Sequence, residues 1–220
     1  MMCDEEEMRF ASAQAGLFDT AARCMRRPDA GLAAEIIAGS LTRRFGMLRS
    51  SSDPRVAQAL EELTSFERAC SSDEPGTLRL RLEVEYNRLF VGPAALPAPP
   101  YESYYASEAR VSGGGRLRGE EERAVLRAYG QRGFAVSEEL SELPDHIALE
   151  LEFLYLVSSD EAHAWSRGDA ALAMELQEAQ ASFIRNHVGR WVGHLSERAR
   201  EAARTPFYPA VLDLATSFCA

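Results

Sequence analysis

Residues 78–86 read Leu-Arg-Leu-Arg-Leu-Glu-Val-Glu-Tyr, and this stretch decides the fold class. Its apolar residues alternate with charged ones, a period of two that is typical of a half-buried β-strand. The stretch also offers a helical face with Leu78, Leu82 and Tyr86, and it is poor in β-branched residues. Residues 147–155 show nearly the same ambiguity. We expect helices in both places. Two strands would have to pair with each other as a lone hairpin, which is marginally stable.

Helical periodicity surrounds these two segments. Apolar residues recur at helical spacing within residues 4–26, 29–48 and 184–199. Asp53-Pro54 and Thr205-Pro206 each combine a good capping residue with a proline suited to the first helical turn. The chain is therefore predicted to be an all-α, single-domain helical bundle over residues 1–220.

One region between the helical blocks differs in composition. Residues 91–105 hold four prolines and three tyrosines. Because proline fixes φ and biases the preceding residue towards extended conformations, we expect an ordered loop over these residues. Residues 111–118 contain three consecutive glycines, which predict a mobile Gly-rich loop.

Composition excludes several classes of function. The net charge is −10 and all 24 basic residues are arginine, so a P-loop lysine and a pyridoxal Schiff base are both impossible. The acidic total argues against a nucleic-acid partner. The four cysteines and four histidines are scattered, so we expect no metal site and no cofactor. No apolar run approaches the roughly 20 residues of a membrane span, and the acidic N-terminus lacks the pattern of a secretory signal, which predicts a cytoplasmic protein.

Three sequence blocks rise above this background: residues 86–93 (YNRLFVGP), 99–105 (PPYESYY) and 143–146 (LPDH). In this order and at these separations they resemble the TorD/DmsD/NarJ family of cytoplasmic chaperones for molybdenum-containing oxidoreductases. The likeness covers residues 78–218, and it departs from the family at Tyr104, where members more often carry a smaller aliphatic residue. It implies a helical bundle of the TorD/DmsD type, without enzymatic activity, present as a monomer or a helix-exchanged dimer. Its partner would be a molybdopterin oxidoreductase apoprotein, whose twin-arginine leader it binds while it assists cofactor insertion and assembly before export.

The resemblance places the leader-binding surface on residues of all three blocks: Tyr86, Leu89, Phe90, Gly92, Pro93, Pro100, Tyr101, Glu102, Ser103, Asp145 and His146. A leader offers two guanidinium groups followed by an apolar run, so its receptor needs carboxylates beside an aromatic and proline-lined groove.

Two neighbouring residues of the third block have open roles. Asp145 either caps the helix that begins beside it or faces the arginines of the leader. His146 donates a hydrogen bond to the bound peptide, switches the affinity with pH, or supports the loop. The alternative function is a small-molecule or nucleotide-binding hydrolase that uses Asp145 and His146 as an acid/base pair.

Overall fold

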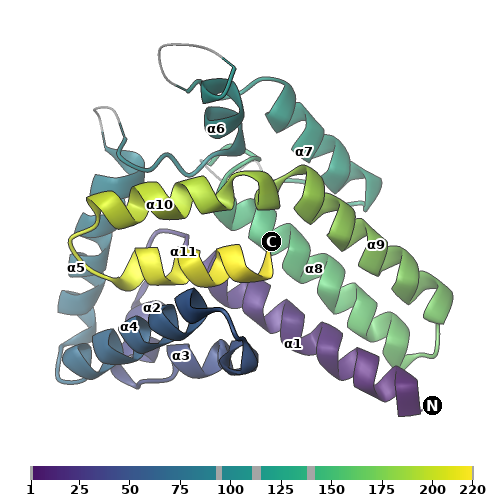
Figure 1. Cartoon of the computed structure of the whole chain (residues 1–220), viewed down its shortest axis with the longest axis horizontal. Coiled ribbons are helices and arrows are strands. Elements are labelled where there is room, and N and C mark those ends of the chain that lie inside the picture. The colour runs from purple at the N-terminus through teal and green to yellow at the C-terminus, as the bar shows by residue number, and fades with distance from the viewer. Residues whose placement is uncertain (1, 93–95, 111–114, 138–141, 220) are drawn as a thin grey trace. The chain divides into compact units, whose positions relative to one another are not determined.

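The computed structural model describes residues 2–92, 96–110, 115–137 and 142–219 (Figure 1). These residues form helices and, apart from one isolated β-bridge, no β-structure. Both ambiguous segments are helical, since residues 78–86 lie in α5 (Pro75–Tyr86) and residues 147–155 lie in α8 (Ile147–Ser166). The predicted all-α fold class is confirmed.

The alternation within α5 corresponds to two faces of one helix. Leu78 and Leu82 are buried, whereas Leu80 and Val84 point outward. A helix with 3.6 residues per turn places residues four apart on the same face, so two interleaved apolar pairs fall on different sides. A strand-like pattern in the sequence has therefore produced a helix with apolar side chains both inside and outside.

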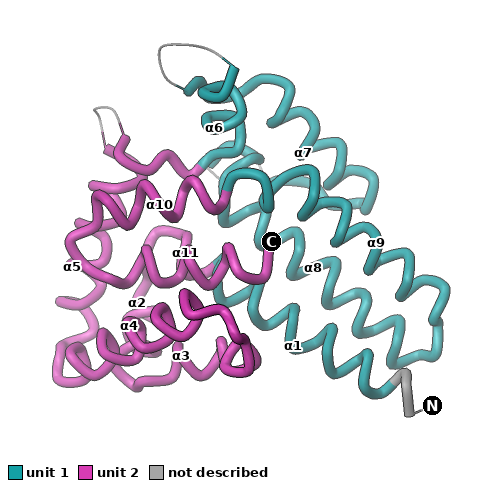
Figure 2. Tube along the Cα trace, in the orientation of Figure 1, with its two compact units in different colours: residues 1–22, 101–191 teal, residues 23–100, 192–220 magenta. Residues whose placement is uncertain are grey.

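The chain divides into two compact units (Figure 2). Unit 1 comprises residues 1–22 and 101–191. It contains most of α1 (Met2–Cys24) and all of α6 (Glu102–Glu108), α7 (Glu120–Gln131), α8, α9 (Ala170–Asn186) and the 3₁₀ turn η3 (Val188–Arg190). Unit 2 comprises residues 23–100 and 192–220; beyond α5, it contains α2 (Ala30–Ile37), α3 (Leu41–Arg44), the 3₁₀ turn η1 (Gly46–Ser50), α4 (Pro54–Cys70), the π-helical turn η2 (Asn87–Val91), α10 (Val192–Ala202) and α11 (Phe207–Phe218).

The core of unit 1 is built on the long pair α8 and α9, which pack along their length (Figure 1). The rings of Phe153 on α8 and Phe183 on α9 lie 4.6 Å apart, and Tyr129 of α7 lies 4.9 Å from Phe153. This aromatic cluster anchors α7 to the pair, because Val125 and Tyr129 are the buried residues of α7.

The core of unit 2 is built on α4, α10 and α11. Helix α4 begins as predicted at Asp53-Pro54, where the Asp53 carboxylate accepts the N–H of Arg55 at 2.8 Å. The buried Glu67 on α4 accepts the backbone N–H groups of Leu41 and Thr42, at 2.8 and 3.2 Å, and so holds the start of α3.

The loop predicted over residues 91–105 is wrong in part, because α6 begins at Glu102. The prolines constrain the backbone only as far as Pro100, and the start of α6 finds its hydrogen-bond acceptor in a distant residue, described below. Residues 93–95 and 111–114 lie outside the described residues, so mobility of the Gly-rich loop stays a prediction. Gly115 lies against Tyr104, whose carbonyl would collide with any added Cβ.

Across the described part of the chain, no helix combines the length and apolar character that a membrane span requires.

Candidate functional site

The second and third sequence blocks meet within unit 1. Tyr101 and His146 form an isolated antiparallel β-bridge, with their rings edge to face and 5.2 Å apart. Beside the bridge, the N–H of Glu102 donates to the carbonyl of Asp145 at 3.0 Å. The fold thus joins two motifs that are far apart in the sequence.

Asp145 is fully buried and serves the start of α6. Its Oδ2 accepts the backbone N–H of Ser103 at 2.8 Å, and its Oδ1 has no hydrogen-bond partner among the described residues. The helix that begins beside Asp145 is capped instead by His146, whose Nδ1 accepts the N–H of Ala148 at 3.1 Å. Of the two roles left open for Asp145, that of capping its own helix is therefore wrong. Its carboxylate caps a helix elsewhere in the sequence and does not face solvent.

The buried carboxyl groups of Glu102, Asp145 and Glu150 lie close enough in unit 1 to interact electrostatically. Oε2 of Glu102 lies 2.9 Å from Nδ1 of His187, and Oε2 of Glu150 accepts the indole N–H of Trp191 at 3.2 Å. Burial raises the pKa of Glu150 well above its usual range, and the charges of Glu102 and Asp145 raise it further. The environment therefore favours the protonated, neutral form of Glu150.

Sequence reasoning missed Glu150 and His187 as members of this cluster. Glu150 stands within the apolar run of residues 147–151, and an acidic residue on a buried helix face is a signal that could have found it. His187 carries no comparable signal, because its partner Glu102 is supplied by the tertiary fold.

The first sequence block contributes to the core of unit 2. The rings of Tyr86, Phe90 and Tyr208 pack together with centroids 5.3–5.9 Å apart. Leu89 is fully buried, and its carbonyl accepts the N–H of Ala98 at 3.2 Å. Both Leu89 and Phe90 lie in η2. Such π-helical turns are rare in proteins, but those that occur are often found at functional sites.

The predicted leader-binding residues therefore divide between the two units. The five in unit 2 are Tyr86, Leu89, Phe90, Gly92 and Pro100. The five in unit 1 are Tyr101, Glu102, Ser103, Asp145 and His146. Pro93 lies outside the described residues. Of the ten described residues, only Gly92 and Tyr101 are partly exposed, and the others are buried. In this conformation most of the motif residues form a framework rather than an open surface.

An apolar cavity of 220 Å³ lies in unit 1 about one turn along α8 from His146. It is lined mainly by Tyr129, Phe134, Val136, Leu149, Phe153 and Leu156. Ligand pockets typically measure about 300–1,000 Å³, so this cavity suits one large apolar side chain better than a whole small molecule.

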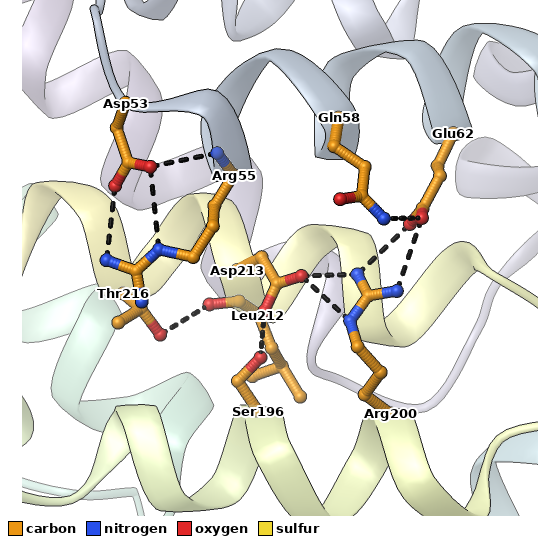
Figure 3. Close-up of polar contacts among 9 residues, drawn as sticks. All are labelled: Asp53, Arg55, Gln58, Glu62, Ser196, Arg200, Leu212, Asp213 and Thr216. Atoms are coloured by element: carbon orange, nitrogen blue, oxygen red, sulfur yellow. Dashed lines mark hydrogen bonds and ion pairs between the residues drawn. The ribbon is translucent and has the colours of Figure 1, made fainter.

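A polar cavity of 370 Å³ lies in unit 2 among α4, α10 and α11. Figure 3 shows polar contacts that join these helices. Arg200 pairs there with both Glu62 and Asp213, and Ser196 donates to Asp213. Burial alone would raise the pKa of Glu62, but hydrogen bonds from Arg200 and Gln58 outweigh it and lower that pKa. Because Arg200 on α10 bridges Glu62 on α4 and Asp213 on α11, we assign the network to the joining of three helices.

The geometry does not support an acid/base pair made of Asp145 and His146. The two side chains are buried, and they accept hydrogen bonds from the backbones of different helices. In the described ranges, no group of three or more His, Cys, Asp or Glu residues is placed to hold a metal ion.

Comparison with known proteins gives a consistent set of relatives. The family model described as "Nitrate reductase delta subunit" matches residues 51–197. Chaperone protein TorD of Vibrio cholerae serotype O1 (strain M66-2) is 30 % identical over 142 residues, which are 64 % of this chain and 60 % of that protein. Chaperone protein TorD of Vibrio parahaemolyticus serotype O3:K6 is 27 % identical over 143 residues, which are 64 % of this chain and 62 % of that protein. The chain thus spans about three fifths of the length of these relatives.

A crystal structure of a putative redox enzyme maturation protein from Archaeoglobus fulgidus also aligns with the chain. The alignment covers 94 % of this chain and 92 % of the other, with a TM-score of 0.48 and 19 % identity. At this level of similarity the match carries no argument about function.

Proposed function

Because the chain belongs to the nitrate reductase delta subunit family, we propose that it is a cytoplasmic chaperone for a molybdopterin oxidoreductase. It binds the twin-arginine leader of that enzyme and assists cofactor insertion and assembly before export. The observation that carries the proposal is the family match over residues 51–197, which contains all three sequence blocks. The relatives named as TorD chaperones support it.

The arrangement in unit 1 supports two different roles for the motif residues, contact with the leader and positioning of the residue that makes this contact. Tyr101 is partly exposed, and the β-bridge to His146 fixes its backbone. Asp145 and Ser103 hold the next residues from inside through their hydrogen bond. We assign Tyr101 to contact with the leader and the buried partners to positioning of Tyr101. In unit 2, the buried cluster around Phe90 holds in the same way the turn that ends at Gly92.

The apolar cavity on α8 supports recognition of the apolar part of the leader. A leader continues from its arginines into an apolar run, which needs an apolar cavity or groove to bind in. Leu149 and Phe153 line the cavity from the same helix that His146 caps. One large side chain of the apolar run would fill it.

Isothermal titration calorimetry with the full chain tests this function. The probe is a synthetic leader with two consecutive arginines followed by an apolar run, and its matched control carries two glutamines in place of the arginines. We expect the arginine peptide to bind at least about tenfold more tightly, a difference of about 1.4 kcal/mol. Equal affinity for the two peptides, or no binding of the first, would overturn the proposal.

The variant Asp145→Asn separates direct pairing from positioning. A solvent-exposed ion pair with the leader weakens as salt rises, so the loss on substitution would shrink between about 50 and 300 mM salt. A positioning role predicts a loss of affinity of similar size at both salt concentrations, because the Asp145 side chain is buried. Glu178→Gln, on an exposed carboxylate of α9, is the matched control and leaves affinity unchanged.

A further inference from the structure

The outward side of α5 carries an apolar surface that the proposed leader site does not use. Leu80 and Val84 lie one turn apart there and are 54 % and 64 % exposed. Single exposed apolar residues are ordinary, whereas two on the same helical face form a continuous apolar strip. We call Leu80 and Val84 the α5 surface.

Arginines rim the α5 surface. Arg27 and Arg79 both pair with Glu83 at 2.7 Å, and Arg81 pairs with Asp73 at 2.9 Å. Because Arg79 and Arg81 flank Leu80 in the sequence of a helix, they lie on opposite sides of the apolar residues.

In these pairs the cation is the more exposed partner. The side chain of Arg27 is 67 % exposed against 18 % for Glu83, and that of Arg81 is 52 % exposed against 25 % for Asp73. The carboxylates thus lie closer to the protein, while the guanidinium groups reach solvent. Counted with their carboxylate partners, the three arginines leave an excess of one positive charge, and the guanidinium groups are the parts exposed to an incoming partner.

We propose that the α5 surface docks an acidic amphipathic helix of a partner protein. Apolar residues three and four apart on that helix would rest on Leu80 and Val84, and its flanking carboxylates would meet Arg27, Arg79 and Arg81. Buried apolar area supplies affinity, and charge complementarity sets orientation and speeds encounter. The proposal is independent of leader binding, because a twin-arginine leader is cationic and does not complement the exposed guanidinium groups.

An anionic membrane offers a similar combination of apolar and negative chemistry. A membrane presents its negative charge over an extended plane, so it would meet a whole face of this chain and not the arginines alone, and the net charge of −10 opposes that approach. A helix of limited extent also matches a surface made of one helical face better than a continuous bilayer does. The protein partner is therefore the occupant to which we commit.

Fluorescence anisotropy with the full chain tests the proposal. The probe is a labelled synthetic helix of about 18 residues with leucines three and four apart and glutamates beside them, and its control carries arginines in place of the glutamates. We expect the acidic helix to bind at least about tenfold more tightly than the basic one, and to bind more weakly at about 300 mM than at 50 mM salt.

The double variant Leu80→Gln/Val84→Gln removes the apolar contacts without changing any charge. We expect it to weaken the acidic helix about tenfold or more. Met174→Gln, at a residue of α9 that is 57 % exposed, is the matched control and leaves binding unchanged. Arg81→Gln retains the apolar pair, and we expect it to reduce both the affinity and its dependence on salt.

Four results would overturn the proposal: no binding of the acidic helix, equal binding of the two helices, unchanged binding by the double variant, or an equal loss with Met174→Gln. Binding to phosphatidylserine vesicles that disappears in the double variant would assign the surface to membranes instead. A loss of leader affinity in the double variant would make the surface part of the leader site. Unchanged leader affinity, together with lost binding of the acidic helix, supports an independent surface.

Discussion

The indole N–H of Trp191 donates a hydrogen bond at 3.2 Å to Oε2 of Glu150, a carboxyl group that is completely buried in unit 1. The bond links the first turns of α8 to the segment that follows η3. Glu102 and Asp145 place two further buried carboxyl groups close enough to raise the pKa of Glu150. The raised pKa of Glu150 predicts that the stability of unit 1 depends on pH.

Glu150→Gln tests this sensitivity. The pKa of Glu150 is raised in the folded state, so the folded chain holds a proton that the unfolded chain releases above about pH 4.3. The contribution of Glu150 to stability is full below that pH and is lost as pH rises towards the raised pKa. Urea denaturation across this range should show wild type losing stability relative to Glu150→Gln as pH rises. A constant difference between the two proteins would contradict the assignment, and Glu175→Gln, at an exposed carboxylate, should show no such trend.

Asp145→Ala removes the acceptor that holds the start of α6. The N–H of Ser103 would be left buried without a partner, at a cost of about 1–3 kcal/mol in the free energy of unfolding. Asp145→Asn retains an oxygen acceptor and should lose less. Asp169→Ala removes the exposed cap of α9 and is the matched control, with an expected loss of about 1 kcal/mol. Chemical denaturation measures all three variants, and equal stability of Asp145→Ala and wild type would exclude the capping role.

Glu67→Ala should destabilise unit 2 by about 2–4 kcal/mol. The carboxylate of Glu67 accepts two backbone N–H groups and, at 2.6 Å, the hydroxyl of Thr42, so its loss leaves three buried donors unpaired. Thr42→Val removes only the hydroxyl donor and should cost less than Glu67→Ala. Equilibrium unfolding in urea gives both values, and a larger loss for Thr42→Val would contradict this order.

Tyr208→Phe should lower stability by about 1 kcal/mol. The hydroxyl of Tyr208 donates to the carbonyl of Leu82 at 3.1 Å in the core of unit 2, and burial raises its pKa well above the usual range. The substitution retains the ring that packs on Tyr86 and Phe90. Tyr155→Phe, at a half-buried residue of α8, should change stability by less than about 0.5 kcal/mol. Thermal unfolding compares the two variants. Similar losses of stability would show that the Tyr208 hydrogen bond does not stabilise unit 2.

Local sequence predicted the helices well, because spacing and capping act within a few residues. Asp53-Pro54 begins α4 as expected, and residues 78–86 form a helix despite their alternation. The start of α6 at Glu102 escaped prediction, since its acceptor is Asp145, which lies far along the chain. The contact of His187 with Glu102 could not be predicted for the same reason, because the two residues are far apart in the sequence.

The sequence by itself determined the all-α class, the absence of lysine chemistry and the family to which the motifs point, because composition, helical period and motif spacing are properties of the chain alone. Only the tertiary structure decided that Asp145 faces inward, that Glu150 joins a buried acid cluster, and that Leu80 and Val84 are left outside. Burial and the pairing of polar groups depend on which distant segments meet, and a local pattern does not specify those meetings.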